Sequence, residues 1–405
     1  MNWFSCVVRA ESDKIYGVQE EYVNDKRDNK INLSIGVFRD QNGQSFVPQS
    51  VINCEQMLFT KNCSKEYAPI EGFKDFRQSV AKFIYGEDSD VIINERHATV
   101  QGLGGTGSLR IGAIFLYELV SVNKTVYIPY QTWSPHNQVF SNSGFQIKHY
   151  RYWNQRTLNL DFEGLINDFE NMIDYSVVVL HSIAHNPTGI DPTLDQWNQI
   201  IDVIQRKKLF PFLDCAYQGF ASGDLQRDGV VNTLFAKRVN QMAIAMTFAK
   251  NMGLYGDRIG ALSIVCQTKQ EAHNVLTQLK AIIRPIYSHP PNWGALVVHH
   301  LLSDHHLRSQ WFIDVNNMYT RIQDIRNQLI NELNRLSDGK TNWDFMANQR
   351  GMYGFTGFSQ TQVFQLKQQF AIYATLDGRI NIAVINQNNI KHIAYAMHCI
   401  KLQIM

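Results

Sequence analysis

Short apolar runs alternate with amphipathic segments along most of this 405-residue chain. The apolar runs have the length of buried strands, and the amphipathic segments carry apolar residues at the spacing of one helix face. The predicted strands cover residues 31–37, 125–128, 175–180, 209–213, 242–248 and 261–265. The predicted helices cover residues 12–24, 54–58, 73–85, 162–172, 194–207, 269–283 and 389–402, with a long helical region at 295–336 that Ser303 and Asp304 could interrupt. This alternation predicts an α/β protein with a largely parallel or mixed central sheet.

Several residues with useful chemistry follow the ends of the predicted strands. Asn186 lies in the turn after strand 175–180, Asp214 follows strand 209–213, and Lys250 follows strand 242–248. The carboxyl ends of the strands form the usual ligand edge of an open α/β sheet. A lysine in partly apolar surroundings has a lowered pKa and can act as a nucleophile, although a surface lysine at a strand–loop junction is the alternative.

A glycine-rich turn, GLGGTGS, precedes an amphipathic helix that we expect to open near Ser108. Free N–H groups and the dipole at a helix N-terminus favour a phosphate group. Thr247 and Arg258, on either side of Lys250, could complete an anion anchor. The glycines alone are weak evidence for a dinucleotide site, and we find no acidic residue ending a second strand about 20 residues further on. A mononucleotide-like or cofactor phosphate fits better than NAD.

Three further residues lie where the predicted elements end. Gly36 is at the end of strand 31–37, where the backbone could approach a ligand. Trp133 follows strand 125–128 and could stack on an aromatic ring or pack in the core. Tyr67 lies in a loop broken by proline and glycine, and its role is open.

Composition narrows the possible functions. The net charge is +2 with no strongly basic block, which gives no support for binding to a nucleic-acid backbone. No segment approaches the roughly 18 consecutive apolar residues of a membrane-spanning helix. The six cysteines are scattered and the 13 histidines show no metal-ligand spacing, so we expect reduced thiols and no metal. The N-terminus carries acidic residues early and has no targeting pattern, so we expect a cytoplasmic protein.

Residues 1–11 precede any regular element and include Trp3, Phe4, Val7 and Val8. A free tail seldom exposes such residues, so we expect this arm to dock on a surface, such as that of a second subunit.

Five motifs occur in one order along the chain: GGTGSLRIGA, HNPTG, LDCAYQGF, TFAKNMGLYGDRIG and GRIN. This ordered set resembles the aspartate aminotransferases, class I pyridoxal 5'-phosphate enzymes of fold type I. The likeness extends from residues 32–40 to residues 378–385. It implies a large domain with a mostly parallel seven-stranded sheet between helices, and a smaller α/β domain built from both chain ends. The implied parts are the arm (1–11), the small domain (12–45 and 317–405) and the large cofactor-binding domain (46–316).

The resemblance also implies roles for the cofactor-binding residues. Lys250 would carry the internal aldimine and shuttle the substrate proton, Asp214 would pair with the ring nitrogen, and Tyr217 would hydrogen-bond the ring hydroxyl together with Asn186. Trp133 would stack on the ring. Gly105, Thr106, Thr247 and Arg258 would hold the phosphate, with Tyr67 reaching it from the other subunit. His136 and His181 would support Trp133 and Asp214. Gly104 and Ala249 depart from the serine that relatives often carry there.

On the substrate side, Arg379 would bind the α-carboxylate, and Arg284 of the neighbouring subunit would bind the distal carboxylate of aspartate or glutamate. Gly36, Trp133 and Asn186 would also contact the substrate.

The implied function is an aspartate aminotransferase, active as a homodimer with shared sites. It would transfer an amino group reversibly, by a ping-pong route, between L-aspartate and 2-oxoglutarate, giving oxaloacetate and L-glutamate. The alternatives are a broad-specificity aspartate/aromatic aminotransferase, another pyridoxal-phosphate reaction such as decarboxylation or acyl transfer, and an inactive scaffolding protein. Arg284 favours transamination of dicarboxylates over other reactions, and the intact Lys250, Asp214 and Arg379 argue against an inactive protein.

Overall fold

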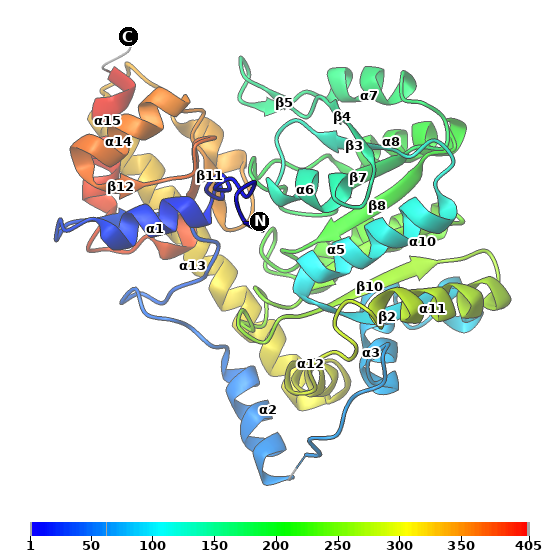
Figure 1. The fold of residues 1–405 in the computed structure, drawn as a ribbon. Helices are drawn as coiled ribbons and strands as arrows, with labels where there is room; N and C mark the ends of the chain where they lie inside the picture. Colours follow the sequence, from blue (N-terminus) through cyan, green and yellow to red (C-terminus); the bar gives the residue numbers. More distant parts are fainter. Residues whose placement is uncertain (1, 62, 403–405) are drawn as a thin grey trace.

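A seven-stranded sheet forms the centre of the larger part of the computed structural model, which describes residues 2–61 and 63–402 (Figure 1). The strand order is β2-β10-β9-β8-β7-β3-β4. Strand β10 is antiparallel to both of its neighbours, and the other neighbouring pairs are parallel. The strands are β2 (His97–Leu103), β3 (Thr125–Pro129), β4 (Gln146–Tyr150), β7 (Val177–His181), β8 (Phe210–Cys215), β9 (Met242–Thr247) and β10 (Ile259–Val265). The predicted mostly parallel, seven-stranded sheet is confirmed.

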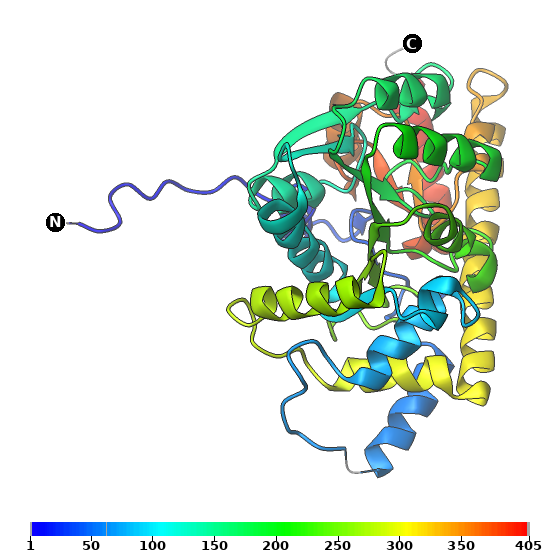
Figure 2. The same ribbon diagram turned by 90° about the vertical axis from the view of Figure 1, so that its right-hand side faces the viewer.

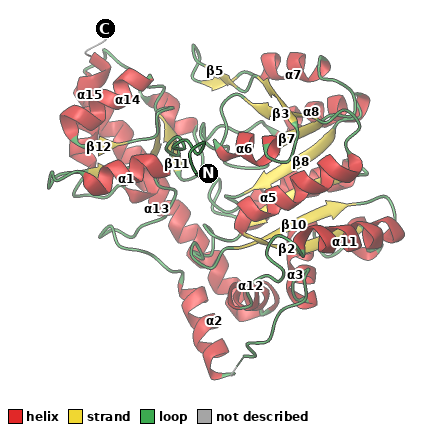
Figure 3. Ribbon diagram, viewed as in Figure 1, coloured by secondary structure: helices red, strands yellow, loops and turns green. Residues whose placement is uncertain are grey.

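Helices cover both faces of this sheet (Figure 3). Successive residues of the strands point to opposite faces: Val178 and Leu180 belong to one hydrophobic core, and Val177 and Val179 to the other. Because a hydrophobic core covers each face of the sheet, the strands are apolar throughout. This explains why the sequence shows continuous apolar runs and no alternation of apolar and polar residues. The first core is closed by α3 (Lys74–Tyr85), α7 (Phe162–Glu170), α8 (Leu194–Arg206) and α10 (Val230–Arg238), and the second by α5 (Gly104–Phe115), α6 (Pro135–Ser141) and α11 (Lys269–Ile283).

A separate hydrophobic core lies in a smaller lobe built from both ends of the chain (Figure 1). Helix α13 (His305–Ser337) joins the two lobes, since Trp311 and Val315 belong to a core of the sheet and Met318 and Ile322 to the core of the smaller lobe. The domain boundary after residue 316 stays a prediction, which this change of core supports. The other elements of the lobe are α1 (Tyr16–Asn24), β1 (Ile31–Asn32), η2 (Asp344–Asn348), β11 (Tyr353–Phe355), α14 (Gln360–Phe370), β12 (Ile372–Tyr373), β13 (Arg379–Asn381), η3 (Ile382–Val384) and α15 (Ile390–Leu402).

The predicted interruption of the long helical region is confirmed. Helix α12 (Trp293–Ser303) ends before Asp304, whose carboxylate accepts the N–H groups of His306 and Leu307 and begins α13. The remaining short elements are α2 (Gln49–Thr60), α4 (Asp90–Ile93), η1 (Leu116–Val120), β5 (Trp153–Asn154), β6 (Asn159–Leu160) and α9 (Leu225–Asp228). No helix in the described part of the chain is long and apolar enough to cross a membrane.

Several predicted elements are wrong in their extent: helix 12–24 begins only at Tyr16, and helix 54–58 covers Gln49–Thr60. Strand 31–37 stops at Asn32, because the next carbonyl groups bond to side chains: Ser34 O accepts from Arg379, and Ile35 O and Val37 O accept from Asn381. Helix α5 begins at Gly104, not near Ser108, and the Ser108 hydroxyl already donates to Gly104 O one turn earlier. The glycines are therefore part of the first turn of the helix.

The N-terminal arm extends away from the rest of the molecule (Figure 2). Trp3, Phe4, Val7 and Val8 are each more than two-thirds exposed. These apolar side chains therefore do not pack on the described part of their own chain. Residue 1 of the arm and residues 403–405 of the predicted small domain lie outside the described residues.

Candidate active site

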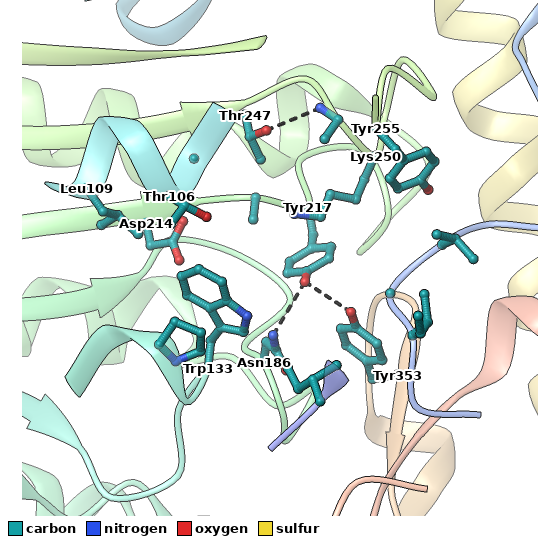
Figure 4. Close-up of a pocket in the computed structure, with 18 of the residues that line it drawn as sticks. Thr106, Leu109, Trp133, Asn186, Asp214, Tyr217, Thr247, Lys250, Tyr255 and Tyr353 are labelled. Atoms are coloured by element: carbon teal, nitrogen blue, oxygen red, sulfur yellow. Dashed lines mark hydrogen bonds between the residues drawn. The ribbon is translucent and has the colours of Figure 1, made fainter. Parts of the chain in front are cut away.

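A cavity of about 260 Å³ lies between the sheet and the smaller lobe. The structure brings most of the predicted site residues together there (Figure 4). These are Gly36, Gly105, Thr106, Trp133, Asn186, Asp214, Tyr217, Thr247, Lys250, Arg258 and Arg379. The cavity thus joins the carboxyl ends of several strands to residues from both ends of the chain.

Lys250 is presented by the turn that follows β9. The next residue, Asn251, is fixed by Trp311 of α13, whose indole N–H donates to Asn251 O at 2.8 Å. The amine lies 5.1 Å from the centre of the Tyr217 ring. Burial lowers the pKa of Lys250 from 10.5 to about 8, and the positive charges of Arg258 and Arg379 add to this, although Asp214 opposes it. At pH 7 about a tenth of the amine is therefore unprotonated and nucleophilic, which is several hundred times the fraction for an ordinary lysine.

Asp214 lies inside β8, in register with His181 of β7 and Ala245 of β9. Its Oδ2 is 3.0 Å from His136 Nε2. Burial alone would raise the pKa of this carboxyl, but the hydrogen bond from His136 and the nearby positive groups outweigh it, so the pKa is lowered. Asp214 therefore stays an anion in a buried position.

A chain of hydrogen bonds leads from the Asn186 backbone to the Asp214 carboxylate. The Asn186 N–H can only donate, so His181 Nδ1, 3.3 Å away, is an acceptor. Burial lowers the pKa of His181 well below 6.5, so the ring is neutral and its proton is on Nε2. That proton is donated to Thr132 Oγ1 at 3.0 Å, and Thr132 Oγ1 also lies 2.8 Å from His136 Nδ1. Because the Asp214 carboxylate can only accept, His136 Nε2 donates to it.

The first turn of α5 and Arg258 lie together at one corner of the cavity, an arrangement that suits an anion. The helix begins without a side-chain cap, so its free N–H groups point into the cavity edge at Gly105 and Thr106. The Arg258 guanidinium packs against Gly104, where a Cβ atom would lie 2.6 Å from Nη2. The Thr247 hydroxyl already has two hydrogen bonds, because it donates to Ile259 O and accepts from Ala249 N. It is therefore less free to bind a phosphate than the prediction assumes.

Arg379 is buried and only partly paired. Its Nη1 donates to Asn186 Oδ1 at 2.9 Å, and Nη2 donates to Ser34 O at 2.8 Å. Nε has no hydrogen-bond partner in the described structure, although the side chain is only 3% exposed. Because the guanidinium lines the cavity and has no acidic partner among its hydrogen bonds, this position favours a ligand with a carboxylate.

Two predicted site residues lie outside this cavity. Tyr67 is 84% exposed and stacks on His289, with ring centres 5.0 Å apart. Arg284 is exposed and bonds to Ser288 and His289. Both therefore share one surface around His289, away from the cavity of their own chain.

The sequence does not predict several residues that line the cavity: Asp13, Ile15, Tyr16, Ile35, Val37, Leu109, Pro135, Ala216, Tyr255 and Tyr353. Tyr255 is within the motif TFAKNMGLYGDRIG, so its neighbourhood could have indicated it. Tyr353 lies between Met352 and Gly354 in GMYGF, which is no signal for a site.

We expect Lys250 to react with small acylating agents at unusually low pH. In cofactor-free protein, its acetylation by acetic anhydride should reach half its maximal rate near pH 8, because only the unprotonated amine reacts. Peptide mass spectrometry measures the rate at each pH. The same peptide in urea-denatured protein is the control and should follow the ordinary value of 10.5. A native midpoint equal to that of the denatured sample would contradict the assignment.

Known proteins with the same architecture cover nearly the whole chain. Residues 28–397 match the sequence family described as aminotransferase class I and II. The chain is 40% identical over 397 residues to the mitochondrial aspartate aminotransferase of Gallus gallus, covering 98% of this chain and 94% of that protein. The cytoplasmic aspartate aminotransferase of Saccharomyces cerevisiae superposes with a TM-score of 0.96 at 36% identity, covering 100% and 99% of the two chains. An aromatic-amino-acid aminotransferase of Burkholderia pseudomallei, covalently bound to pyridoxal phosphate, gives 0.94 at 36% identity over 99% and 100%.

These similarities extend over both lobes and the cavity between them, so they concern the complete fold and not one motif. They confirm the predicted resemblance and the fold class. The chain belongs to the class I and II aminotransferases.

Proposed function

We propose that this protein is a pyridoxal-phosphate-dependent aspartate aminotransferase. The observation that carries the proposal is a single cavity that holds a lysine amine of lowered pKa, a buried carboxylate and a buried arginine with a free donor. The membership of the aminotransferase family and the aspartate aminotransferases among its relatives support it. The predicted cofactor is supported by the same family and by the solved relative that carries it.

The cavity fits pyridoxal phosphate at each of its polar groups. The uncapped first turn of α5 and Arg258 suit the phosphate, and the Arg258 guanidinium lies this close to the turn because Gly104 has no side chain. Asp214, held as an anion by His136, suits a protonated ring nitrogen. When bound, the cofactor supplies an aldehyde that reacts with amines and a ring that accepts electrons.

The residues of the chain would then position the substrate and move its proton. Lys250 Nζ, with its pKa lowered to about 8, is suited to accept the proton from the substrate Cα and to return it. Trp133 lies on the cavity wall, where its indole would cover one face of the cofactor (Figure 4). Tyr217 and Asn186 already bond to each other and would both face the cofactor's hydroxyl.

Arg379 would hold the substrate α-carboxylate with its guanidinium group, since the residue lines the cavity. Because Arg284 and Tyr67 are exposed on another surface, we infer that they serve the site of a second copy. The exposed arm at residues 2–11 would cover that copy's surface. This proposal of a homodimer with two shared sites explains three exposed features with one assembly.

A broader specificity, which includes aromatic amino acids, is the second candidate. It is supported by the likeness to the aromatic-amino-acid aminotransferase of Burkholderia pseudomallei. We also propose a cytoplasmic location, for which the yeast relative is a precedent and the chicken relative a counterexample.

The function is tested by transamination between L-aspartate and 2-oxoglutarate. Native protein loaded with cofactor should form oxaloacetate, and Lys250→Ala should lose at least about 10²–10⁴-fold in kcat, because it removes the proton-transfer amine. A matched control is Lys269→Ala, since Lys269 is exposed at the start of α11. Turnover by Lys250→Ala at the native rate would refute the assigned role.

Arg284 should decide between dicarboxylates and other substrates. Arg284→Leu should lower kcat/KM for aspartate about 100- to 1,000-fold, because the distal carboxylate loses a bidentate partner. The value for phenylalanine should change far less, since Arg379 still holds its single carboxylate. The ratio of the two kcat/KM values is the measurement. An equal loss for both substrates would mean that Arg284 has only a structural role.

Shared sites predict complementation between two defective variants. Lys250→Ala and Arg284→Leu subunits, unfolded and refolded together, should form mixed dimers in which one site has both native residues. Aspartate activity should recover to about a quarter of the native value for random mixing. Each variant refolded alone is the control. If the mixture were no more active than its components, Arg284 would act in the site of its own chain.

A further inference from the structure

Tyr353 lies in the wall of the cavity, beside Tyr217 and Arg379. It is 4% exposed and lies in β11, paired with β13 so that Tyr353 faces Asn381 in register. Its hydroxyl is 3.3 Å from the Tyr217 hydroxyl, and its ring face is 4.2 Å from the Arg379 guanidinium carbon. Figure 4 shows Tyr217 between Asn186 and Tyr353.

These contacts close a ring of four residues. Arg379 donates to Asn186 Oδ1, so the Asn186 amide nitrogen faces Tyr217 and donates to its oxygen at 3.4 Å. Tyr217 then contacts Tyr353 through the two hydroxyls, and the Tyr353 ring returns to Arg379. Each member is thus oriented by two others, which fixes Arg379 and Tyr217 relative to each other.

The backbone of Tyr353 is held from behind by a buried arginine. Arg326 of α13 is fully buried, and its Nη2 donates to Gly351 O at 2.7 Å and to Tyr353 O at 3.0 Å. These bonds join β11 to the long helix. The Tyr353 side chain therefore has little freedom to move away from the cavity.

Gly36 leaves the space that the Tyr353 hydroxyl fills. A Cβ atom at Gly36 would lie 2.1 Å from that oxygen but 3.4 Å from the ring carbon that carries it. The absence of a side chain at residue 36 is thus matched to the hydroxyl of Tyr353 and not to its ring.

We propose that Tyr353 is a positioning residue of this site: its hydroxyl donates to Tyr217 while its ring face holds Arg379, and Gly36 leaves room for that hydroxyl. A phenol oxygen can accept two hydrogen bonds and donate one. Tyr217 accepts from Asn186, and under the proposed function, on which this inference rests, it donates to the cofactor's ring oxygen. The remaining lone pair of the Tyr217 oxygen then accepts a hydrogen bond from the Tyr353 hydroxyl, and this makes the Tyr217 hydroxyl a stronger hydrogen-bond donor.

The first test is the pH-dependent absorbance of the bound cofactor. A donor to the ring oxygen favours the more negative form of the chromophore, so Tyr353→Phe should raise the titration midpoint by about half a pH unit. The same substitution made in Tyr217→Phe protein should add no shift, because the effect acts through Tyr217. Tyr150→Phe, which removes another buried tyrosine hydroxyl bonded to Val179 O, is the control and should leave the midpoint unchanged. No shift in Tyr353→Phe, or an equal shift without Tyr217, would overturn the proposal.

Steady-state kinetics separate the ring from the hydroxyl. Tyr353→Phe keeps the ring over Arg379 and should change KM for aspartate less than about twofold, whereas Tyr353→Leu should raise it about five- to tenfold. Equal KM values for the two variants would remove the role of the ring face.

A third test needs neither cofactor nor activity, so it remains decisive even if the proposed function fails. In cofactor-free protein, Gly36→Ala should lower the thermal midpoint by about 2 °C or more, because its methyl group overlaps the Tyr353 hydroxyl. Adding Tyr353→Phe should restore most of that loss, since the nearest remaining atom is then at an ordinary contact distance. A double variant no more stable than Gly36→Ala would refute the matched pair.

Discussion

The burial of charged groups is the constraint on which the rest of this site depends. Asp214 and Arg379 are buried and Lys250 is partly buried in one cavity, where an unpaired charge is unfavourable. The protein meets the constraint in three ways. The lysine loses its proton more easily, the carboxylate accepts a hydrogen bond from a buried histidine, and the arginine is shared between an amide and a backbone carbonyl.

The same constraint explains why distant parts of the chain converge here. Arg379 comes from β13, while its partners Asn186 and Ser34 follow β7 and β1. A guanidinium has five donors in a fixed plane, so each additional partner restricts the placement of another segment. The smaller lobe is therefore tied to the sheet by the residues that would also bind substrate, and not only by its hydrophobic contacts.

The fold and most of the cavity could be predicted because buried parallel strands leave a clear trace. Their apolar runs mark the strand ends, where Asn186, Asp214 and Lys250 lie. Strand 31–37 was overextended because its carbonyl partners are side chains 344 to 346 positions away in the sequence, which no local pattern contains. Tyr353 was missed for a similar reason, since only tertiary packing brings its hydroxyl to Tyr217.

The single reversed strand of the sheet has its own consequence for the phosphate end of the cavity. If β10 were parallel to β9, the chain would have to return from the carboxyl end of β9 to the opposite end of the strands before β10 could begin. Since β10 is antiparallel, the segment from Lys250 to Arg258 never leaves the edge where β9 ends. Residue Ile259 lies opposite Leu103, the last residue of β2, so Arg258 meets the first turn of α5 directly. Gly260 permits this closeness, because a Cβ atom there would lie 2.7 Å from the carbonyl carbon of Gly104. The reversal of one strand thus brings Arg258 beside the first turn of α5, although the two are far apart in the sequence, and the pair is suited to hold an anion between them.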